Sequence, residues 1–107
     1  MKLAGVKFDN VVFDSGHQVK EAVVTPDRIA LDWIESGAKY HLVAYSQDGG
    51  TYHGTYGMFR PEDDWIVKIT RYAAVDGSVV LFCDWHEKDT GRAGSWLCKL
   101  EPRRTDG

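Results

Sequence analysis

The sequence has 107 residues, of which 43% are hydrophobic and 27% are charged, and its formal net charge at pH 7 is −3. This composition excludes an intrinsically disordered chain, and the length predicts a single domain over residues 1–107. The acidic balance argues against nucleic acid as a partner, because general affinity for phosphate backbones depends on clustered Lys and Arg. Eleven glycines, four tryptophans and five tyrosines are typical of aromatic-rich strands joined by tight turns.

The beginning of the sequence has no apolar run long enough for a signal-peptide core, and nowhere do 18 apolar residues follow one another. We therefore expect a cytoplasmic protein with no membrane partner. Two cysteines are too few for a disulfide-stapled scaffold, and their spacing is not that of a zinc site. The four histidines lack ligand spacing too, so we predict neither a metal nor a cofactor.

Turn signals recur every 8–14 residues along the chain and separate short segments, most of which alternate in polarity. The segments of strand length cover residues 3–13, 17–24, 28–35, 39–46, 51–59, 65–74, 78–87 and 94–101. Eight short, consecutive antiparallel strands predict an all-β fold, an up-and-down barrel.

One segment allows a different interpretation. Thr25 and Pro26 could begin a short helix over residues 26–36, as N-cap and first helical residue, and the fold would then be α+β. We favour a strand, because large apolar residues occupy every second position from Ile29 to Trp33. The acidic segment before Trp65 is a weaker helix signal, since the residues that follow it are rich in β-branched types.

Turn lengths predict how the last strands pair. If residues 89–92 form a four-residue loop, Cys83 lies opposite Cys98 and Trp85 lies opposite Trp96. Directly opposed cysteines are close enough for a disulfide, but a cytoplasmic setting favours buried, reduced thiols.

The preceding turn makes Arg71 the most informative residue. If residues 75–77 form a three-residue loop with Gly77 in the left-handed conformation, Arg71 lies opposite Leu81 on the inner face. A buried guanidinium needs a partner, which is either a polar group of a ligand or an internal contact with a carboxylate or an aromatic ring. Extending the sheet backwards puts Gly54 beside Arg71 and places these residues on the same face: Tyr52, Gly54, Tyr56 and Met58.

Inward-facing aromatic side chains with hydroxyl or indole donors are typical of small-molecule pockets, although they also occur in plain cores. His41 belongs to this set if it shares the inner face with Tyr45. The predicted ligand-binding residues are Arg71, Tyr45, Tyr52, Tyr56, Trp85, Trp96, Trp33 and His41. No catalytic residue is assigned, because no known catalytic motif occurs in the sequence.

The strand meander and the closing hairpin from Val79 to Leu100 resemble the calycin group, which includes the lipocalins, fatty-acid-binding proteins and avidins. The resemblance implies an up-and-down barrel that is open at one end to a ligand. The sequence lacks the N-terminal Gly-x-Trp pattern that those families often carry, so no binding residue is transferred from them.

Three functions fit these observations. The first is a small barrel, monomeric or homodimeric, that binds a small, partly apolar ligand, with Arg71 fixing a polar end. The second is a protein-interaction or oligomerisation module with a filled barrel and exposed aromatic residues such as Trp65 and Phe59. The third is a small isomerase or lyase, which requires Arg71 to converge with a histidine or tyrosine. The sequence favours a protein that is not an enzyme.

Overall fold

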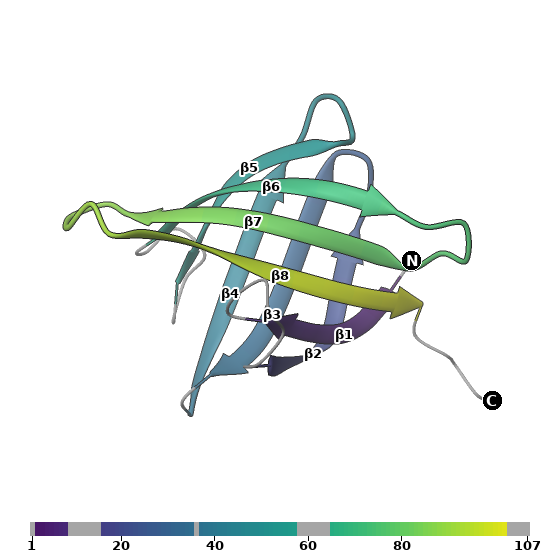
Figure 1. Cartoon of the computed structure of the whole chain (residues 1–107), viewed down its shortest axis with the longest axis horizontal. Coiled ribbons are helices and arrows are strands. Elements are labelled where there is room, and N and C mark those ends of the chain that lie inside the picture. The colour runs from purple at the N-terminus through teal and green to yellow at the C-terminus, as the bar shows by residue number, and fades with distance from the viewer. Residues whose placement is uncertain (1, 9–15, 36, 58–64, 103–107) are drawn as a thin grey trace.

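Eight antiparallel strands follow one another around a closed barrel, as a computed structural model of the chain shows (Figure 1). The structure describes residues 2–8, 16–35, 37–57 and 65–102. The strands are β1 (Lys2–Phe8), β2 (Gly16–Val24), β3 (Arg28–Glu35), β4 (Ala38–Tyr45), β5 (Thr51–Gly57), β6 (Trp65–Ala73), β7 (Val79–Glu87) and β8 (Ala93–Pro102). Each strand pairs with the next, and β8 closes the barrel by pairing with β1. No helix, and hence none able to cross a membrane, occurs in these four ranges.

The predicted all-β fold and its strands are confirmed wherever the structure describes them. Residues 28–35 form strand β3, so the helix alternative for residues 26–36 is wrong. Ile29, Leu31 and Trp33 are buried on the inner face of β3, and the residues between them face outward. A helix would have scattered these three side chains around its axis. The predicted strand residues 9–13 and 58–59, Met58 among them, lie outside the described residues.

The predicted pairing of β6 with β7 is confirmed. Arg71 lies opposite Leu81, and Gly77 has a φ of 90° in the turn between the two strands. The Ala74 N–H donates to the Ser78 carbonyl oxygen at 2.9 Å and closes a loop of three residues. The left-handed conformation of Gly77, the last residue of this loop, therefore determines how β6 and β7 pair.

The predicted pairing of β7 with β8 is wrong by two residues. Cys83 lies opposite Trp96, and Trp85 lies opposite Gly94. The four-residue loop runs from residue 88 to 91, since the Glu87 N–H donates to the Arg92 carbonyl oxygen at 2.8 Å. Its last residue, Gly91, has a φ of 72° and takes the left-handed position.

The two cysteines therefore do not face each other across the hairpin, because Cys98 lies opposite Leu81. Both thiols are free and fully buried in the core. Burial raises the pKa of Cys98 to about 12 and that of Cys83 well above its usual value, so both thiols keep their protons at neutral pH. They pack as small apolar side chains.

The interior is filled by side chains along most of the barrel. Twelve of these side chains are almost completely shielded from solvent: Trp96, Tyr52, Ile29, Leu31, Leu42, Ile69, Leu81, Leu100, Val19, Val67, Cys83 and Cys98. They come from β2 to β8, and the buried Leu3 of β1 joins them, so every strand contributes to one continuous core.

One end of the barrel is closed by contacts between the loops at residues 25–27 and 46–50. The Tyr52 hydroxyl donates to the Thr25 carbonyl oxygen at 2.5 Å, and the Gly49 carbonyl oxygen lies 3.4 Å away. Arg71 donates from Nη1 to the Tyr52 hydroxyl at 3.4 Å, and its N–H donates to the Gly50 carbonyl oxygen at 2.8 Å. Arg71 therefore belongs to this closed end.

Gly54 lies opposite Val67 rather than beside Arg71, so that prediction is wrong. The strand approaches its other neighbour, β4, so closely at this point that a Cβ atom on Gly54 would overlap the Val43 carbonyl oxygen. A backbone atom cannot rotate away from such a contact.

We expect Gly54→Ala to destabilise the protein by about 2 kcal/mol or more, because the added methyl group forces the backbones of β4 and β5 apart. Urea unfolding measures the change. Gly50→Ala is the matched control, since a Cβ there would contact only the Asp48 Oδ1 atom at 3.8 Å. Equal stability of the two variants would contradict the close approach.

The loop that contains Asp48 should make stability depend on pH. Asp48 Oδ1 accepts hydrogen bonds from the Thr51 N–H at 2.9 Å, the Gly50 N–H at 2.8 Å and the Ser46 hydroxyl at 3.0 Å. These bonds, the one from Thr51 first, lower the pKa of Asp48 to about 2 from an ordinary value of 3.8. Because the folded-state pKa is the lower one, the stabilisation is present above pH 3.8 and is lost as the pH falls through about 2.

We therefore expect Asp48→Ala to lower the Tm at pH 7, and the difference from the natural protein to shrink between pH 4 and pH 2. Asp48→Asn is the control, because its amide oxygen still accepts hydrogen bonds without carrying a charge. Thermal unfolding followed by circular dichroism at several pH values tests this. A difference for Asp48→Ala that stays constant down to pH 2 would count against the explanation.

Candidate functional site

All four tryptophans of the chain line one cavity at the end of the barrel opposite to Arg71. The cavity has a volume of about 320 Å³ and lies at the end of the barrel where the 88–91 loop joins β7 to β8. Its lining consists of aromatic and charged residues: Lys7, Trp33, Glu35, Tyr40, Tyr56, Trp65, Trp85, Glu87, Arg92 and Trp96. We call it the mouth cavity.

Two stacked ring pairs build one side of the mouth cavity. Trp33 and Tyr40 are opposite each other on β3 and β4, with ring centroids 5.6 Å apart and an interplanar angle of 8°. Tyr56 and Trp65 are opposite each other on β5 and β6, with centroids 4.9 Å apart and an angle of 13°. Tyr40 also contacts Trp65 at 5.8 Å, so the two pairs form a continuous aromatic wall.

Trp85 forms part of the opposite side. It is opposite Gly94 in the β7–β8 pair, and a Cβ atom at Gly94 would come within 2.7 Å of the Trp85 ring. The indole of Trp85 therefore lies directly over the glycine backbone. A larger residue at position 94 would force this ring to move.

Lys7 provides a buried charge at the floor of the mouth cavity. Its side chain is only 5% exposed, and its Nζ atom lies 3.3 Å from Glu35 Oε1. The same ammonium group lies 5.2 Å and 5.0 Å from the ring centroids of Trp33 and Trp96. Because a bare buried charge is very costly, the carboxylate and the two ring faces are what allow a lysine at this depth.

Two carboxylates hold two of the indole rings in place. Glu35 Oε1 accepts the Trp33 Nε1 hydrogen bond at 3.2 Å, and Glu87 Oε1 accepts that of Trp65 at 3.4 Å. Glu87 also accepts a hydrogen bond from the Thr90 hydroxyl at 2.6 Å and lies 3.7 Å from Arg92. The Thr90 hydrogen bond is the main reason that the pKa of Glu87 is lowered. Both acids are thus partnered, and the lowered pKa keeps Glu87 ionised at neutral pH.

Trp96 differs from these two tryptophans. Its side chain is 2% exposed, and its Nε1 atom has no hydrogen-bond partner in the described part of the chain. The neighbouring Tyr56 ring is 6.4 Å away between centroids, in an edge-on arrangement. Burial raises the pKa of Tyr56, and the nearby Trp96 indole acts weakly in the opposite direction. That contact does not have the geometry of a hydrogen bond, so the Trp96 donor remains unsatisfied.

The structure brings together only half of the predicted ligand-binding residues. Four of them line the mouth cavity: Trp33, Tyr56, Trp85 and Trp96. Tyr52 and Arg71 lie at the closed end, where they contact each other. Of the convergence that an isomerase or lyase would need, the described residues show the contact of Arg71 with Tyr52, and Tyr52 is fully buried.

Tyr45 and His41 lie on the outer face of β4, so the prediction that they face inward is wrong. Tyr45 is 61% exposed, and His41 Nδ1 lies 2.7 Å from Asp32 Oδ1 on the neighbouring strand. The inner positions of β4 are those of Tyr40, Leu42 and Ala44. Because side chains alternate along a strand, an error of one position in the predicted inner face assigned both residues to the wrong side of β4.

Sequence reasoning missed six lining residues: Lys7, Glu35, Tyr40, Trp65, Glu87 and Arg92. Lys7 could have been predicted from the sequence, because it lies two positions after Gly5 and four after Leu3, and every second side chain of a strand shares a face. The argument that selected Arg71 as an inward cation applies equally to it. Trp65 was expected to be exposed for a partner, but it is half-buried and packs against the core. Phe59 lies outside the described residues.

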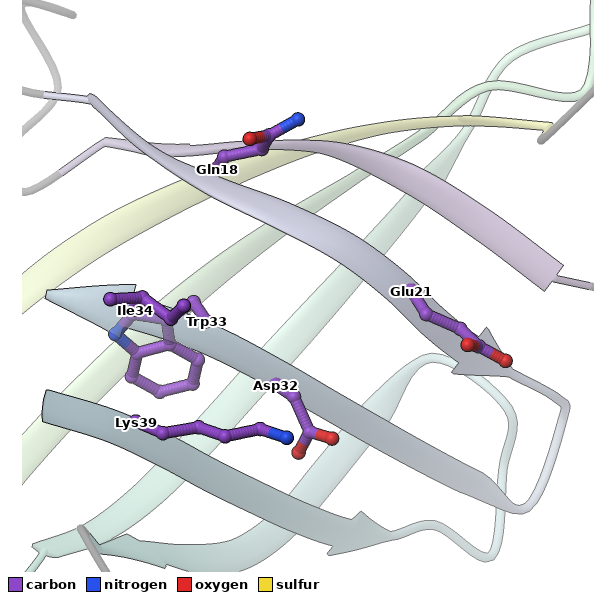
Figure 2. Close-up of a pocket in the computed structure, with 6 residues that line it drawn as sticks. All are labelled: Gln18, Glu21, Asp32, Trp33, Ile34 and Lys39. Atoms are coloured by element: carbon purple, nitrogen blue, oxygen red, sulfur yellow. The ribbon is translucent and has the colours of Figure 1, made fainter.

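A second cleft lies on the side of the barrel between β2 and β3 (Figure 2). These two strands pair only from Glu21 and Asp32 to the loop that joins them, and beyond that point they diverge. The cleft has a volume of about 340 Å³ and is lined by Gln18, Glu21, Asp32, Trp33, Ile34 and Lys39. Four of these residues are polar or charged, but the surface that they expose in the cleft is mainly apolar, more so than that of the mouth cavity, which contains two ion pairs.

The described ranges contain no group of three His, Cys, Asp or Glu side chains that could hold a metal ion. Searches for similar proteins found no matching protein family, curated protein or solved structure. The structure shows a closed antiparallel meander barrel of eight strands, and the resemblance to the calycin group stays a prediction from the sequence.

The Lys7–Glu35 pair allows a test of the cavity floor. We expect Glu35→Gln to destabilise the protein by about 2 kcal/mol, because the nearly buried ammonium group loses its carboxylate. Lys7→Met should cost less, since Glu35 is 31% exposed and can be hydrated, and Met fills a similar volume. Urea unfolding of both single variants and of the double variant measures the interaction free energy between Lys7 and Glu35. A larger loss for Lys7→Met than for Glu35→Gln would contradict this assignment.

Proposed function

We propose that the protein binds a small, flat, partly apolar molecule in the mouth cavity. The observation that carries this proposal is that all four tryptophans line one cavity at one end, whereas the rest of the interior is filled. A plain core would place its largest side chains against one another throughout the barrel. Here the rings also pack against one another, but together they leave a space of about 320 Å³ beside them.

The size of the cavity limits the ligand. Ligand pockets range from roughly 300 to 1,000 Å³, and a volume of about 320 Å³ is at the lower end of that range. Such a space suits a molecule of two fused or linked rings. Flat rings also match the walls, because stacked and edge-on contacts with Trp and Tyr stabilise an aromatic ligand beyond the burial of its surface.

The polar groups of the mouth cavity give the ligand a defined orientation. Lys7, Glu35, Glu87 and Arg92 line it, and the two opposite-sign pairs hold one another. Arg71 is at the other end of the barrel, so the proposal assigns it no contact with the ligand. A neutral ligand with one polar edge fits this surrounding best.

Fluorescence titration with N-phenyl-1-naphthylamine, a neutral two-ring dye that brightens in apolar sites, tests the proposal. We expect saturable binding of one dye per chain. Trp65→Ala and Trp85→Ala should each weaken binding at least fivefold, because each removes a ring face of the cavity. Tyr45→Ala and Tyr72→Ala are the controls, since both side chains are about 60% exposed on the outer face.

Absence of saturable binding to the folded protein, or equal weakening by the two control variants, would contradict the proposal. A dimer that buries Trp65 and binds no dye would instead support the interaction module. Circular dichroism of each variant separates loss of binding from loss of the fold.

A further inference from the structure

Strand β2 contains an extra residue that changes which of its side chains face inward. Ala22 lies opposite Leu3 and Val19 lies opposite Gly5, so β2 uses one residue more than β1 between these two pairs. Such a β-bulge interrupts the regular alternation of a strand. Val19 and Ala22 are accordingly both buried, although they lie three positions apart.

The bulge explains why β2 and β3 separate in Figure 2. Strand β3 alternates regularly, with Ile34 on its outer face. Continued past Glu21 and Asp32, the β2–β3 ladder would place the inward-facing Val19 opposite the outward-facing Ile34. Since paired residues share a face of the sheet, the ladder stops there. We call the second cleft, which lies beyond this point, the side cleft.

The end of the ladder leaves one residue of β3 with backbone groups that point into the side cleft. The backbone N–H and C=O groups of successive residues point alternately to the two neighbouring strands. The Arg28 carbonyl oxygen accepts the Thr25 N–H at 2.8 Å on the β2 side, and the Asp27 carbonyl oxygen accepts the Ser46 N–H at 2.9 Å on the β4 side. Every second residue after Arg28 therefore faces β2, and Ile34 is one of them.

The backbone groups of Ile34 are available to another chain. Ala30 and Asp32 pair with β2, but Ile34 has no backbone hydrogen bond on that side in the described part of the chain. It is 55% exposed and lines the side cleft. An unpaired N–H and C=O at a strand edge are a template for pairing with another strand. The occupant that this edge fits is therefore a piece of extended backbone.

We propose that an extended segment of a partner protein adds to β3 in the side cleft as a short antiparallel strand. One residue of the segment exchanges two backbone hydrogen bonds with Ile34, in the mode known as β-strand addition. Trp33 lines both the side cleft and the mouth cavity, but the two openings use different chemistry. The inference therefore does not depend on the proposed small-molecule function.

The walls of the side cleft determine the size of the side chains in this segment. The residue opposite Ile34 faces outward, where a β-branched apolar side chain packs well against it. Its two neighbours face the inner side, which is already filled, because Val19 is 0% and Trp33 is 2% exposed. We therefore expect small residues on both sides of the β-branched one.

The charges of the side cleft favour a basic residue at one end of the segment. Glu21 and Asp32 line the end at which the β2–β3 ladder begins, whereas Lys39 lies opposite Ile34 on β4. An antiparallel segment runs from Ile34 toward the two carboxylates. A basic residue two positions after the β-branched one thus lies beside charges of opposite sign.

The acetylated and amidated peptide Ala-Val-Ala-Lys is the probe, and nuclear magnetic resonance of the ¹⁵N-labelled protein is the measurement. We expect the Ile34 amide proton to shift downfield as it gains an acceptor, while the indole signals of Trp65 and Trp85 stay in place. Methylation of the peptide's valine nitrogen removes the donor to the Ile34 carbonyl oxygen and should weaken binding about fivefold or more. Glutamate in place of the peptide's lysine should also weaken it.

Hydrogen exchange and proline substitution test the edge itself, without the peptide. The Ile34 amide should exchange at least about tenfold faster than those of Trp33 and Glu35, which face β4. Ile34→Pro should be less destabilising than its matched control Ala30→Pro, because the Ala30 N–H faces β2 within the ladder. Ile34→Pro should also abolish the binding of the peptide.

Slow exchange of the Ile34 amide in dilute protein, or equal destabilisation by the two proline variants, would overturn the open edge. Slow exchange that develops only in concentrated protein would assign the side cleft to a second copy of the chain instead of a partner. An unmoved Ile34 signal at millimolar peptide, or equal binding of the methylated peptide, would overturn strand addition. Shifts of the Trp65 and Trp85 indoles in place of Ile34 would place the peptide in the mouth cavity and overturn it too. Failure of the dye to bind bears on the proposed function alone.

Discussion

A closed barrel allows each strand only one inward-facing set of side chains, and the rest of this structure depends on that constraint. Alternation within a strand and pairing with both neighbours fix the set together, so no strand can change its phase alone. On β3 the inward set runs from Ile29 through Leu31 to Trp33. Similar sets on the other strands place aliphatic residues in the middle of the barrel and all four tryptophans at one end.

The buried ammonium group of Lys7 separates these two regions. Its contacts with Glu35 and with the rings of Trp33 and Trp96 satisfy the charge inside the barrel. An apolar residue in this place could pack the end of the barrel with less desolvation cost. The lysine, the paired acids and the unpartnered Trp96 donor are more polar than stability alone requires, as is common where a site serves binding.

Strand order and most strand limits could be predicted from the sequence, because turn residues and polarity alternation are local signals. The β6–β7 register followed from Gly77, whose left-handed conformation marks the end of its loop. The same rule applied to Gly91 would have given the correct β7–β8 register, but the match of Cys83 with Cys98 favoured a pairing shifted by two residues.

The candidate site was only partly predictable, because its residues come from seven strands and the loop end at Arg92. Trp33, Tyr56, Trp85 and Trp96 were found by their aromatic character, but nothing local shows that they meet at one end. The phase of β4 was ambiguous, since apolar side chains occur on both of its faces. Which end of the barrel is closed depends on contacts that involve the loops, such as that of the Tyr52 hydroxyl with the Thr25 carbonyl oxygen, and these are not visible in the sequence.

The most direct test of the central claim, that the mouth cavity is where a small molecule binds, is nuclear magnetic resonance of the ¹⁵N-labelled protein. Spectra are recorded with and without N-phenyl-1-naphthylamine. If the account is correct, the indole signals of all four tryptophans shift together, because all four line the cavity. The amide signals of Tyr52 and Arg71, at the closed end, should stay in place. Shifts confined to the closed end or to the outer faces, with unchanged indole signals, would contradict the account.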